Sequence, residues 1–343
     1  MSGGVDSSVA AHLLQQEGYA CIGCTMKLWC GNAAENTKDA EAVAQRMGIP
    51  FHVYDFQDCF HNKVIRNFIE SYERGITPNP CIQCNKYLKF GTMLEAALKN
   101  GCDYIATGHY AQIKQDPESG RYLLYKAADK TKDQTYFLYS LTQHQLAHTL
   151  FPLGELTKDE ARQIAEAEGF VTARKKDSQD ICFVPSGDYV AFMKDYTRKS
   201  YPSGNYLDLS GNVVGKHQGA VCYTLGQRKG LGIALGAPAY VIAKDMAKNT
   251  VTVGPNEALL HNALRAGDFN WIPFPSLSDP IRVTAKIRHS QNEQAATVYP
   301  ESNGTIRVEF DAPQRAITPG QAVVLYQGDM VVGGGTITEA FTL

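Results

Sequence analysis

The sequence lacks the features that mark membrane and secreted proteins. No window approaches 18 consecutive apolar residues, so no membrane-spanning helix is predicted. The N-terminus has no basic and then apolar leader of the secretory type. Nine cysteines in 343 residues are too sparse, and odd in number, for a disulfide-stapled secreted fold. These absences predict a cytoplasmic protein with no membrane partner.

The chain also has little net charge. Thirty-three Lys and Arg residues face 35 Asp and Glu residues, which gives a formal charge of −2. This balance excludes nucleic-acid binding driven by net charge and leaves only a local basic path. Hydrophobic residues at 44% and charged residues at 20% are typical of globular proteins. At roughly 150 residues per domain, the length predicts two or three domains.

The first half of the chain alternates short apolar runs with helical patterns. Strands are predicted over residues 21–29, 51–56 and 104–108, and helices over residues 39–47, 58–74 and 86–98. Strands separated by helices indicate a parallel sheet with helices on both faces and a ligand at the carboxyl ends of its strands.

Beyond about residue 200 the pattern changes to antiparallel β-structure. Turn-forming residues there separate alternating apolar runs at residues 281–287, 296–299 and 322–326. We predict an α/β domain over residues 1–199, a small β-rich central module over 200–265 and a β-barrel-like C-terminal module over 266–343.

A loop suited to phosphate binding opens the chain as Ser2-Gly3-Gly4-Val5-Asp6-Ser7-Ser8. Its glycines let the backbone approach an anion, and its hydroxyl and first-turn N–H groups can point at phosphate oxygens. A plain capped helix start is the simpler alternative. The pattern G-x-x-x-x-G-K-[ST] is absent, which disfavours γ-phosphate transfer of the kinase type. Such a loop normally follows a strand, so we expect the first, central strand of the sheet to be missing.

Two cysteines, Cys81 and Cys84, form a C-x-x-C on a two-proline loop just before a predicted helix. The positive end of that helix is expected to lower a thiol pKa and favour thiolate. Half a zinc site or a redox pair has the same pattern, but no further ligand follows at short spacing. Cys182, at the end of the α/β half, is expected to meet the pair in space.

Five strings carry a specific resemblance, and they are SGGVDSS, TPNPCIQCNKYLKF, ATGHYA, KDQTYFL and KKDSQDICFVP. Their order and spacing resemble the tRNA-uridine 2-sulfurtransferases, a family of PP-loop ATP pyrophosphatases, over nearly the whole chain. The resemblance implies an adenine nucleotide alpha hydrolase-like PP-loop domain, with ATP and Mg²⁺ as cofactors and tRNA as partner. A persulfide or sulfur-carrier protein is implied as the sulfur donor.

By this resemblance Cys84 matches the nucleophile and Cys182 the cysteine that carries sulfur as a persulfide. Cys81 stands where many family members have aspartate. The resemblance further assigns ATP contacts to Ser2, Gly3, Gly4, Val5, Asp6, Ser7, Met26 and Gly108, and target-base contacts to Asn79, Pro80 and Cys81. It assigns tRNA contacts to His109, Lys132, Asp133, Gln134, Arg288, His289 and Gln321.

Two chemistries follow, both starting from a wobble uridine that ATP adenylates. In the first, persulfide sulfur from Cys182 attacks the base and Cys84 releases it by forming a disulfide with Cys182. In the second, Cys81, Cys84 and Cys182 hold a 4Fe-4S cluster whose open iron delivers sulfur. The three-thiol set slightly favours the cluster. Rival functions are another PP-loop adenylating enzyme and a non-catalytic, metal-stabilised RNA-binding module.

Overall fold

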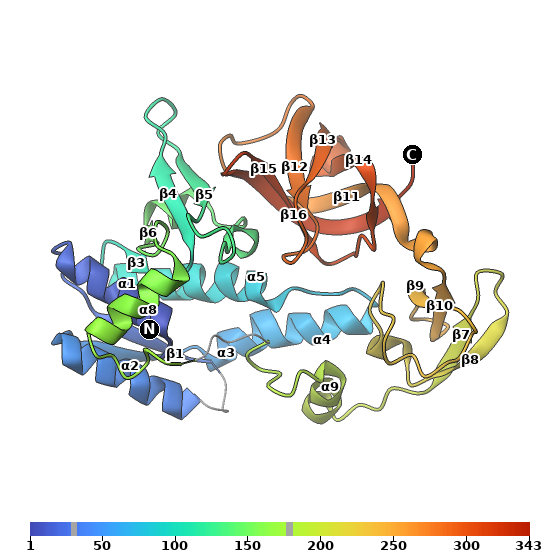
Figure 1. The fold of residues 1–343 in the computed structure, drawn as a ribbon, viewed down its shortest axis with the longest axis horizontal. Helices are drawn as coiled ribbons and strands as arrows, with labels where there is room; N and C mark the ends of the chain where they lie inside the picture. Colours follow the sequence, from blue (N-terminus) through green and yellow to red (C-terminus); the bar gives the residue numbers. More distant parts are fainter. Residues whose placement is uncertain (29–32, 176–180) are drawn as a thin grey trace.

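The computed structural model describes residues 1–28, 33–175 and 181–343. An α/β part comes first, followed by a small central sheet and a C-terminal barrel (Figure 1). The helices are α1 Val5–Gln16, α2 Ala33–Met47, α3 Gln57–Phe60, α4 Arg66–Glu73, α5 Pro80–Cys84, α6 Met93–Lys99, α7 Gln143–Ala147, α8 Lys158–Ala167 and α9 Tyr189–Thr197. The strands of the α/β part are β1 Gly23–Lys27, β2 Phe51–Asp55, β3 Ile105–Ala106, β4 Ala111–Gln115, β5 Tyr122–Lys126 and β6 Thr149–Leu150.

The predicted parallel pairing is present in two separate pieces. Strand β1 pairs in parallel with β2, and β3 pairs in parallel with β6. Between described residues, no strand bonds β1 to β3. Met1 lies alongside β1, where its carbonyl oxygen accepts a hydrogen bond from Thr25 Oγ1 at 2.6 Å. The sheet is therefore two short parallel pairs and not the single layer that the sequence predicts.

Two long helical stretches correspond to the helices predicted over 58–74 and 86–98, and each contains a π-helical segment. In the first stretch this segment is His61–Ile65, between α3 and α4. In the second it is Asn85–Thr92, between α5 and α6. The second begins six residues earlier than predicted, at Pro80, because Asn79 caps the helix and proline is favoured at its first position. Both cysteines of the C-x-x-C therefore lie inside the helix and not before it.

The two β modules follow in sequence order. The central sheet has the order β8-β7-β10-β9, with β7 Gly204–Leu207, β8 Val213–His217, β9 Tyr240–Asp245 and β10 Thr250–Gly254. The C-terminal strands are β11 Leu260–Trp271, β12 Ile281–Lys286, β13 Gln294–Pro300, β14 Ile306–Arg315, β15 Ala322–Gln327 and β16 Met330–Phe341. Pairing of β11 with both β14 and β16 closes these six strands into a barrel. The antiparallel runs predicted from the sequence are confirmed.

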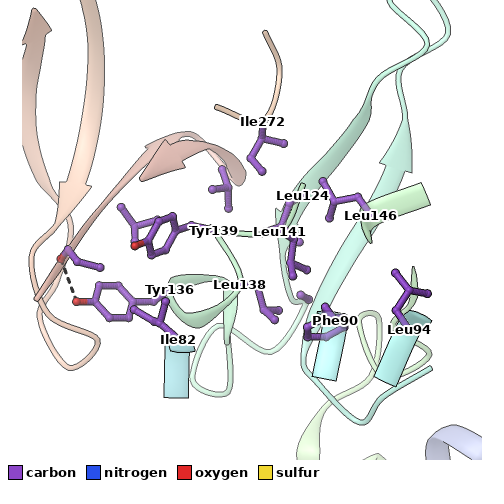
Figure 2. Close-up of a cluster of buried hydrophobic side chains, with 14 of the residues drawn as sticks. Ile82, Phe90, Leu94, Leu124, Tyr136, Leu138, Tyr139, Leu141, Leu146 and Ile272 are labelled. Atoms are coloured by element: carbon purple, nitrogen blue, oxygen red, sulfur yellow. Dashed lines mark hydrogen bonds between the residues drawn. The ribbon is translucent and has the colours of Figure 1, made fainter. Parts of the chain in front are cut away.

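The barrel packs directly against the α/β part. The β4–β5 hairpin joins the barrel sheet through the pair Tyr125 and Met330. A shared buried core lies beneath this junction, where Ile82 of α5 is close to Tyr136 (Figure 2). This core fixes the helix that carries Cys84 relative to the barrel. No described helix has the length and apolar character needed to cross a bilayer.

Candidate active site

The phosphate loop, residues 2–8, starts α1 as the sequence predicts. Gly3 has a φ of 67°, in the left-handed region that favours glycine, and Gly4 is the N-cap residue. Ser7 Oγ lies 3.3 Å from Ser2 Oγ and accepts a hydrogen bond from the Ser2 N–H at 3.0 Å. The hydroxyl groups of Ser2 and Ser7 therefore lie together at the start of α1, where the first backbone N–H groups of a helix have no intrahelical acceptor. Such a helix start is suited to an anion.

Asp6 of this loop is held by a lysine that sequence reasoning missed. Lys158 Nζ donates to both carboxylate oxygens of Asp6, at 2.7 and 2.8 Å, and Tyr110 Oη donates to Oδ1 at 2.9 Å. Lys158 is only 4% exposed. Helix α8 starts after a capping box at Thr157, a pattern typical of an ordinary exposed helix start. The sequence therefore contains no signal for the pair of Lys158 and Asp6. The Asp6 carboxylate therefore anchors the loop to α8.

Gly108 lies against the phosphate loop as expected for a residue that follows a parallel strand. A Cβ atom at this position would lie 2.6 Å from the Asp6 carbonyl carbon and 2.7 Å from the Ser7 nitrogen. Real Cβ atoms do not come so close to backbone atoms. Only glycine allows this contact between the strand end and the loop.

His109 follows Gly108 and points toward the cysteine helix. Its Nε2 lies 3.4 Å from Lys89 Nζ and its Nδ1 lies 2.7 Å from Thr107 Oγ1. Burial, reinforced by Lys89, holds the pKa of His109 well below its ordinary value. The ring is therefore neutral at pH 7, and its Nε2 accepts from the Lys89 ammonium because that group has only donors. Both ring nitrogens are used inside the protein.

The cysteine helix α5 starts where the loop of residues 77–79 ends. Asn79 Oδ1 accepts a hydrogen bond from the Ile82 N–H at 3.4 Å, and Pro80 is buried at the first helical position. Ile82, between the two cysteines, is buried in the core shared with the barrel. Cys81 is exposed, whereas Cys84 is partly buried.

The structure brings together Cys81, Cys84 and Cys182, which we call the thiol cluster. The pKa of Cys84 is raised to about 11, mainly by burial and in smaller part by the neighbouring Cys182, Cys81 and Cys59, whereas Lys89 lowers it. Although Cys81 and Cys182 reach solvent, the protein packed around each thiol also raises its pKa. The eight described cysteines are all free.

The expectation of a lowered pKa at the helix start is wrong for Cys84. The sequence placed this thiol just outside the helix, with solvent on one side and the helix dipole on the other. In the structure it lies at the end of the first turns and packs against the cluster that contains Phe60 and Leu88. Desolvation disfavours the charged thiolate, and this effect outweighs the attraction of the Lys89 ammonium.

Lys89 is a cation beside the thiol cluster, and no role for it was predicted from the sequence. It follows Cys84 by five residues, which in an α-helix would place it about 140° around the axis. The π-helical segment Asn85–Thr92 bonds residue i to residue i+5 and returns Lys89 toward the face of Cys84. From there Lys89 lowers the pKa of Cys81, Cys84 and Cys182 alike.

Within the described ranges, no three His, Cys, Asp or Glu side chains are placed to hold one metal ion. The Asp6 carboxylate, which could serve Mg²⁺, is taken up by Lys158. Residues 176–180 of the KKDSQDICFVP string, just before Cys182, lie outside the described residues.

The KDQTYFL segment is held mainly by its own polar side chains. Asp133 accepts hydrogen bonds from the Ala127 N–H at 3.1 Å and from Thr135 Oγ1 at 2.6 Å. Gln134 Oε1 accepts from the Tyr110 N–H at 2.9 Å. Lys132 is half-buried beside them. Asp133 and Gln134 therefore shape the segment that presents Lys132.

Barrel residues meet this segment from the other side. His289 packs against Phe137 with the rings tilted by 34° and their centroids 4.5 Å apart, and its Nε2 lies 3.5 Å from the Asp133 carbonyl oxygen. Arg288 donates to the Ala316 carbonyl at 2.9 Å. The predicted tRNA residues Lys132, Asp133, Arg288 and His289 thus come together at one junction. Met26 lies apart from them on β1, opposite Tyr54.

Gln321, which the resemblance assigns to tRNA, bonds to the loop before the cysteine helix. Its Nε2 donates to the Thr77 carbonyl at 3.0 Å and to the Pro78 carbonyl at 3.2 Å. The Gln321 amide therefore fixes these two backbone carbonyls to the barrel.

Comparisons with known proteins match all three parts of the chain. Family models described as "tRNA methyl transferase HUP domain", "tRNA methyl transferase PRC-barrel domain" and "Aminomethyltransferase beta-barrel domain" match residues 1–186, 190–255 and 261–337. The predicted fold class, a PP-loop domain followed by two β modules, is confirmed. The U34-tRNA thiolase NcsA from Methanococcus maripaludis with its 4Fe-4S cluster is a far more distant solved structure. Its TM-score of 0.36 at 18% identity, over 57% of this chain and 65% of that one, is too low to bear on the site.

Curated relatives are similar over their whole length. The tRNA-specific 2-thiouridylase MnmA of Clostridioides difficile is 49% identical, covering 99% of this chain and 97% of the relative. The protein of the same name from Symbiobacterium thermophilum is 52% identical, covering 99% of this chain and 91% of the relative. The chain also has the phosphate loop, thiol cluster and barrel described above. This similarity over nearly the whole chain shows that the protein belongs to the tRNA-specific 2-thiouridylase family.

Proposed function

We propose that this chain uses ATP to replace the C2 oxygen of a tRNA wobble uridine with sulfur. The observation that carries the proposal is the contact through Gly108 and His109. Gly108 packs on the phosphate loop, and His109 contacts Lys89 beside the thiol cluster. A nucleotide on the loop and a base beside the thiols can therefore meet at one place. Family membership supplies the substrate class.

The first step is adenylation of the base. The uridine O2 attacks the α-phosphorus of ATP, pyrophosphate leaves, and an O2-adenylated uridine forms. Ser2, Ser7 and the first N–H groups of α1 bind the leaving phosphates, and Gly4, Val5 and Asp6 shape the loop. Lys158 already pairs with the Asp6 carboxylate, so Mg²⁺ would be held mainly by the phosphates of ATP. When bound, it would neutralise their negative charge. Met26 and Gly108 flank the nucleotide.

The second step transfers sulfur from Cys182 as a persulfide. Its terminal sulfur attacks C2 of the base and AMP leaves, so that base and Cys182 share a disulfide. The Cys84 thiolate then attacks Sγ of Cys182, forms the Cys84–Cys182 disulfide and releases the thiolated base. A donor protein must load each persulfide, and an external thiol reductant must reopen each disulfide.

Lys89 and His109 prepare these thiols. The ammonium lowers the pKa of each cysteine. Neutral His109 accepts a hydrogen bond from this ammonium and adds no charge of its own. Cys81, one turn before Cys84, contacts the target base together with Asn79 and Pro80. The RNA itself lies across Lys132, Arg288 and His289, whose segments meet at the barrel junction.

The test is release of pyrophosphate from ATP in the presence and absence of tRNA. We expect pyrophosphate in amounts equal to 2-thiouridine formed, and release that depends on tRNA. A non-catalytic RNA-binding module would bind tRNA and release none. Another PP-loop adenylating enzyme would release pyrophosphate with a small-molecule substrate and leave tRNA unchanged.

The 4Fe-4S alternative is tested by iron counting after anaerobic reconstitution. The persulfide route uses Cys81 neither as carrier nor as releasing thiol. It therefore predicts substoichiometric iron, and a loss of rate below about tenfold in Cys81→Ser. Four irons per chain that disappear together with activity in Cys81→Ser would establish the cluster instead.

A further inference from the structure

A short piece of the barrel contacts both other parts of the molecule. It comprises residues 315–321, from the last residue of β14 to the residue before β15, and we call it the junction strap. At its start Arg315 donates from Nε to Asn256 Oδ1 at 2.7 Å and from Nη2 to the Gly226 carbonyl at 3.2 Å. Ala316 follows with a φ of 52°, which is uncommon for a residue other than glycine. The strap is thus fixed to the central module in a constrained conformation.

The other end of the junction strap is hydrogen-bonded to the loop before the cysteine helix. The Thr77 N–H donates to the Pro319 carbonyl at 3.1 Å, and Gln321 Nε2 donates back to the Thr77 carbonyl at 3.0 Å. A second contact from Gln321 reaches the Pro78 carbonyl at 3.2 Å. Both polar groups of the Thr77 backbone are therefore bonded to the barrel.

Gly320 allows the two backbones to come this close. Its φ is 89°, and a Cβ atom there would lie 2.0 Å from Ile76 Cγ2 and 2.9 Å from the Thr77 carbonyl oxygen. Any larger residue must push the loop away from the barrel. The loop and the strap are in direct van der Waals contact with no space between them.

The same stretch of barrel also supports the inner face of the cysteine helix. Ala322, directly after Gln321, accepts a hydrogen bond from Tyr136 Oη at 3.0 Å. Figure 2 shows Tyr136 beside Ile82, which lies between the two cysteines of α5. Residues 319–322 therefore hold both the loop that starts this helix and the core that covers its buried face.

The junction strap is tied as well to the proposed RNA face. Arg288 donates from Nη2 to the Ala316 carbonyl at 2.9 Å and to Thr318 Oγ1 at 2.8 Å. Any shift of Arg288 on binding a phosphate is transmitted to the strap by these two bonds.

We propose that Gly320 and Gln321 are positioning residues, which set the place of Cys81 and Cys84 and couple it to RNA docking on the barrel. This inference rests on the proposed function for its chemical outcome, but not for the mechanical contact itself. It assigns the Gln321 amide to the catalytic loop and predicts that it acts on the rate of sulfur transfer more than on tRNA affinity.

The experiment compares Gly320→Ala with Gly328→Ala. Both glycines have positive φ, at 89° and 59°, but no atom lies within 4 Å of a Cβ at Gly328. The two variants therefore share the backbone strain and differ in the contact with the loop. Gln321→Leu is the second variant, because it removes the donor at similar size. The readouts are tRNA affinity, the single-turnover rate of 2-thiouridine formation and hydrogen exchange of the peptide spanning residues 75–85.

For Gly320→Ala and Gln321→Leu we expect a rate loss of at least about tenfold, since misplacement of a reacting group by an ångström is costly. The tRNA affinity should change by less than about threefold, and the Thr77 amide should exchange faster. Adding Ile76→Ala to Gly320→Ala removes the tightest contact and should restore part of the rate. Gly328→Ala should leave exchange at residues 75–85 unchanged.

Equal effects of Gly328→Ala and Gly320→Ala on exchange at residues 75–85 would overturn the proposal. So would a rate loss fully explained by weaker tRNA binding. If the unmodified protein makes no 2-thiouridine, the proposed function fails on its own. The exchange measurement then decides the positioning role: faster exchange in both strap variants supports it, and unchanged exchange overturns it.

Discussion

Lys89 Nζ lies 3.4 Å from His109 Nε2, and this contact joins the thiol cluster to the phosphate loop. Lys89 belongs to the helix that carries Cys84, whereas His109 follows the glycine that packs on Asp6 and Ser7. Since His109 is buried and neutral, it orients the ammonium without supplying a charge. The lysine is therefore free to stabilise thiolates on its other side.

Replacing Lys89 by methionine should make Cys84 less reactive. One unit of thiol pKa corresponds to about 1.4 kcal/mol of interaction with the charge. Loss of the ammonium should therefore lower the alkylation rate of Cys84 at neutral pH by about tenfold, whereas Lys89→Arg should retain most of it. Mass-resolved iodoacetamide labelling measures both. An unchanged rate in Lys89→Met would show that this ammonium does not act on Cys84.

The pH dependence of the same labelling tests the raised pKa of Cys84. Only the thiolate reacts, so the rate should climb with pH through the alkaline range toward the pKa of about 11. In protein unfolded by urea, the ordinary thiol pKa of about 8.5 should bring the plateau to lower pH. A native plateau near neutral pH would mean that Cys84 rests as a thiolate, as the helix start alone predicts.

Serine replacements should separate chemistry from binding. Cys84→Ser and Cys182→Ser should each abolish thiolation in a single turnover, because one removes the releasing thiol and the other the carrier. Affinity for tRNA should stay within about threefold, since it depends on phosphate and shape contacts elsewhere. Cys222→Ser is the matched control, a free thiol outside the cluster whose Sγ contacts the Gln218 carbonyl. Normal thiolation by Cys182→Ser would be incompatible with the persulfide route.

Removing Lys158 should destabilise the phosphate loop. Its ammonium is buried against Asp6, whose side chain is 33% exposed, so Lys158→Met should cost about 2–3 kcal/mol of unfolding free energy. The control is Lys199, whose side chain is 56% exposed in its pair with Glu73, so Lys199→Met should cost less than about 1 kcal/mol. Denaturant titration measures both, and equal losses would argue against a structural role for the buried pair. ATP affinity should fall only in Lys158→Met.

Local patterns were sufficient to predict much of the fold and the thiol cluster. Alternation of apolar and polar residues located β12 and β15, and the strings around Cys84 and Cys182 placed these thiols at one site. Their proximity in the structure agrees with that prediction. Gly108 was expected at a ligand site, because ligands gather at the carboxyl ends of parallel strands, and its ATP contact stays a prediction.

Contacts between distant segments could not be predicted. The π-helical segment that turns Lys89 toward Cys84 has no signature in a period of 3.6 residues. Lys158 and Gln321 act through partners 152 and 244 residues away in the chain, respectively. The pKa of Cys84 was predicted in the wrong direction because it depends on burial by such distant residues, which helix position alone does not reveal.

The most direct test of sulfur transfer to tRNA is mass spectrometry of tRNA nucleosides from a strain that lacks its own 2-thiouridine-forming gene. Expression of this chain should restore 2-thiouridine, and expression of Cys84→Ser at equal level should not. Full 2-thiouridine with the Cys84→Ser protein, or none with the unmodified chain present and folded, would contradict the account.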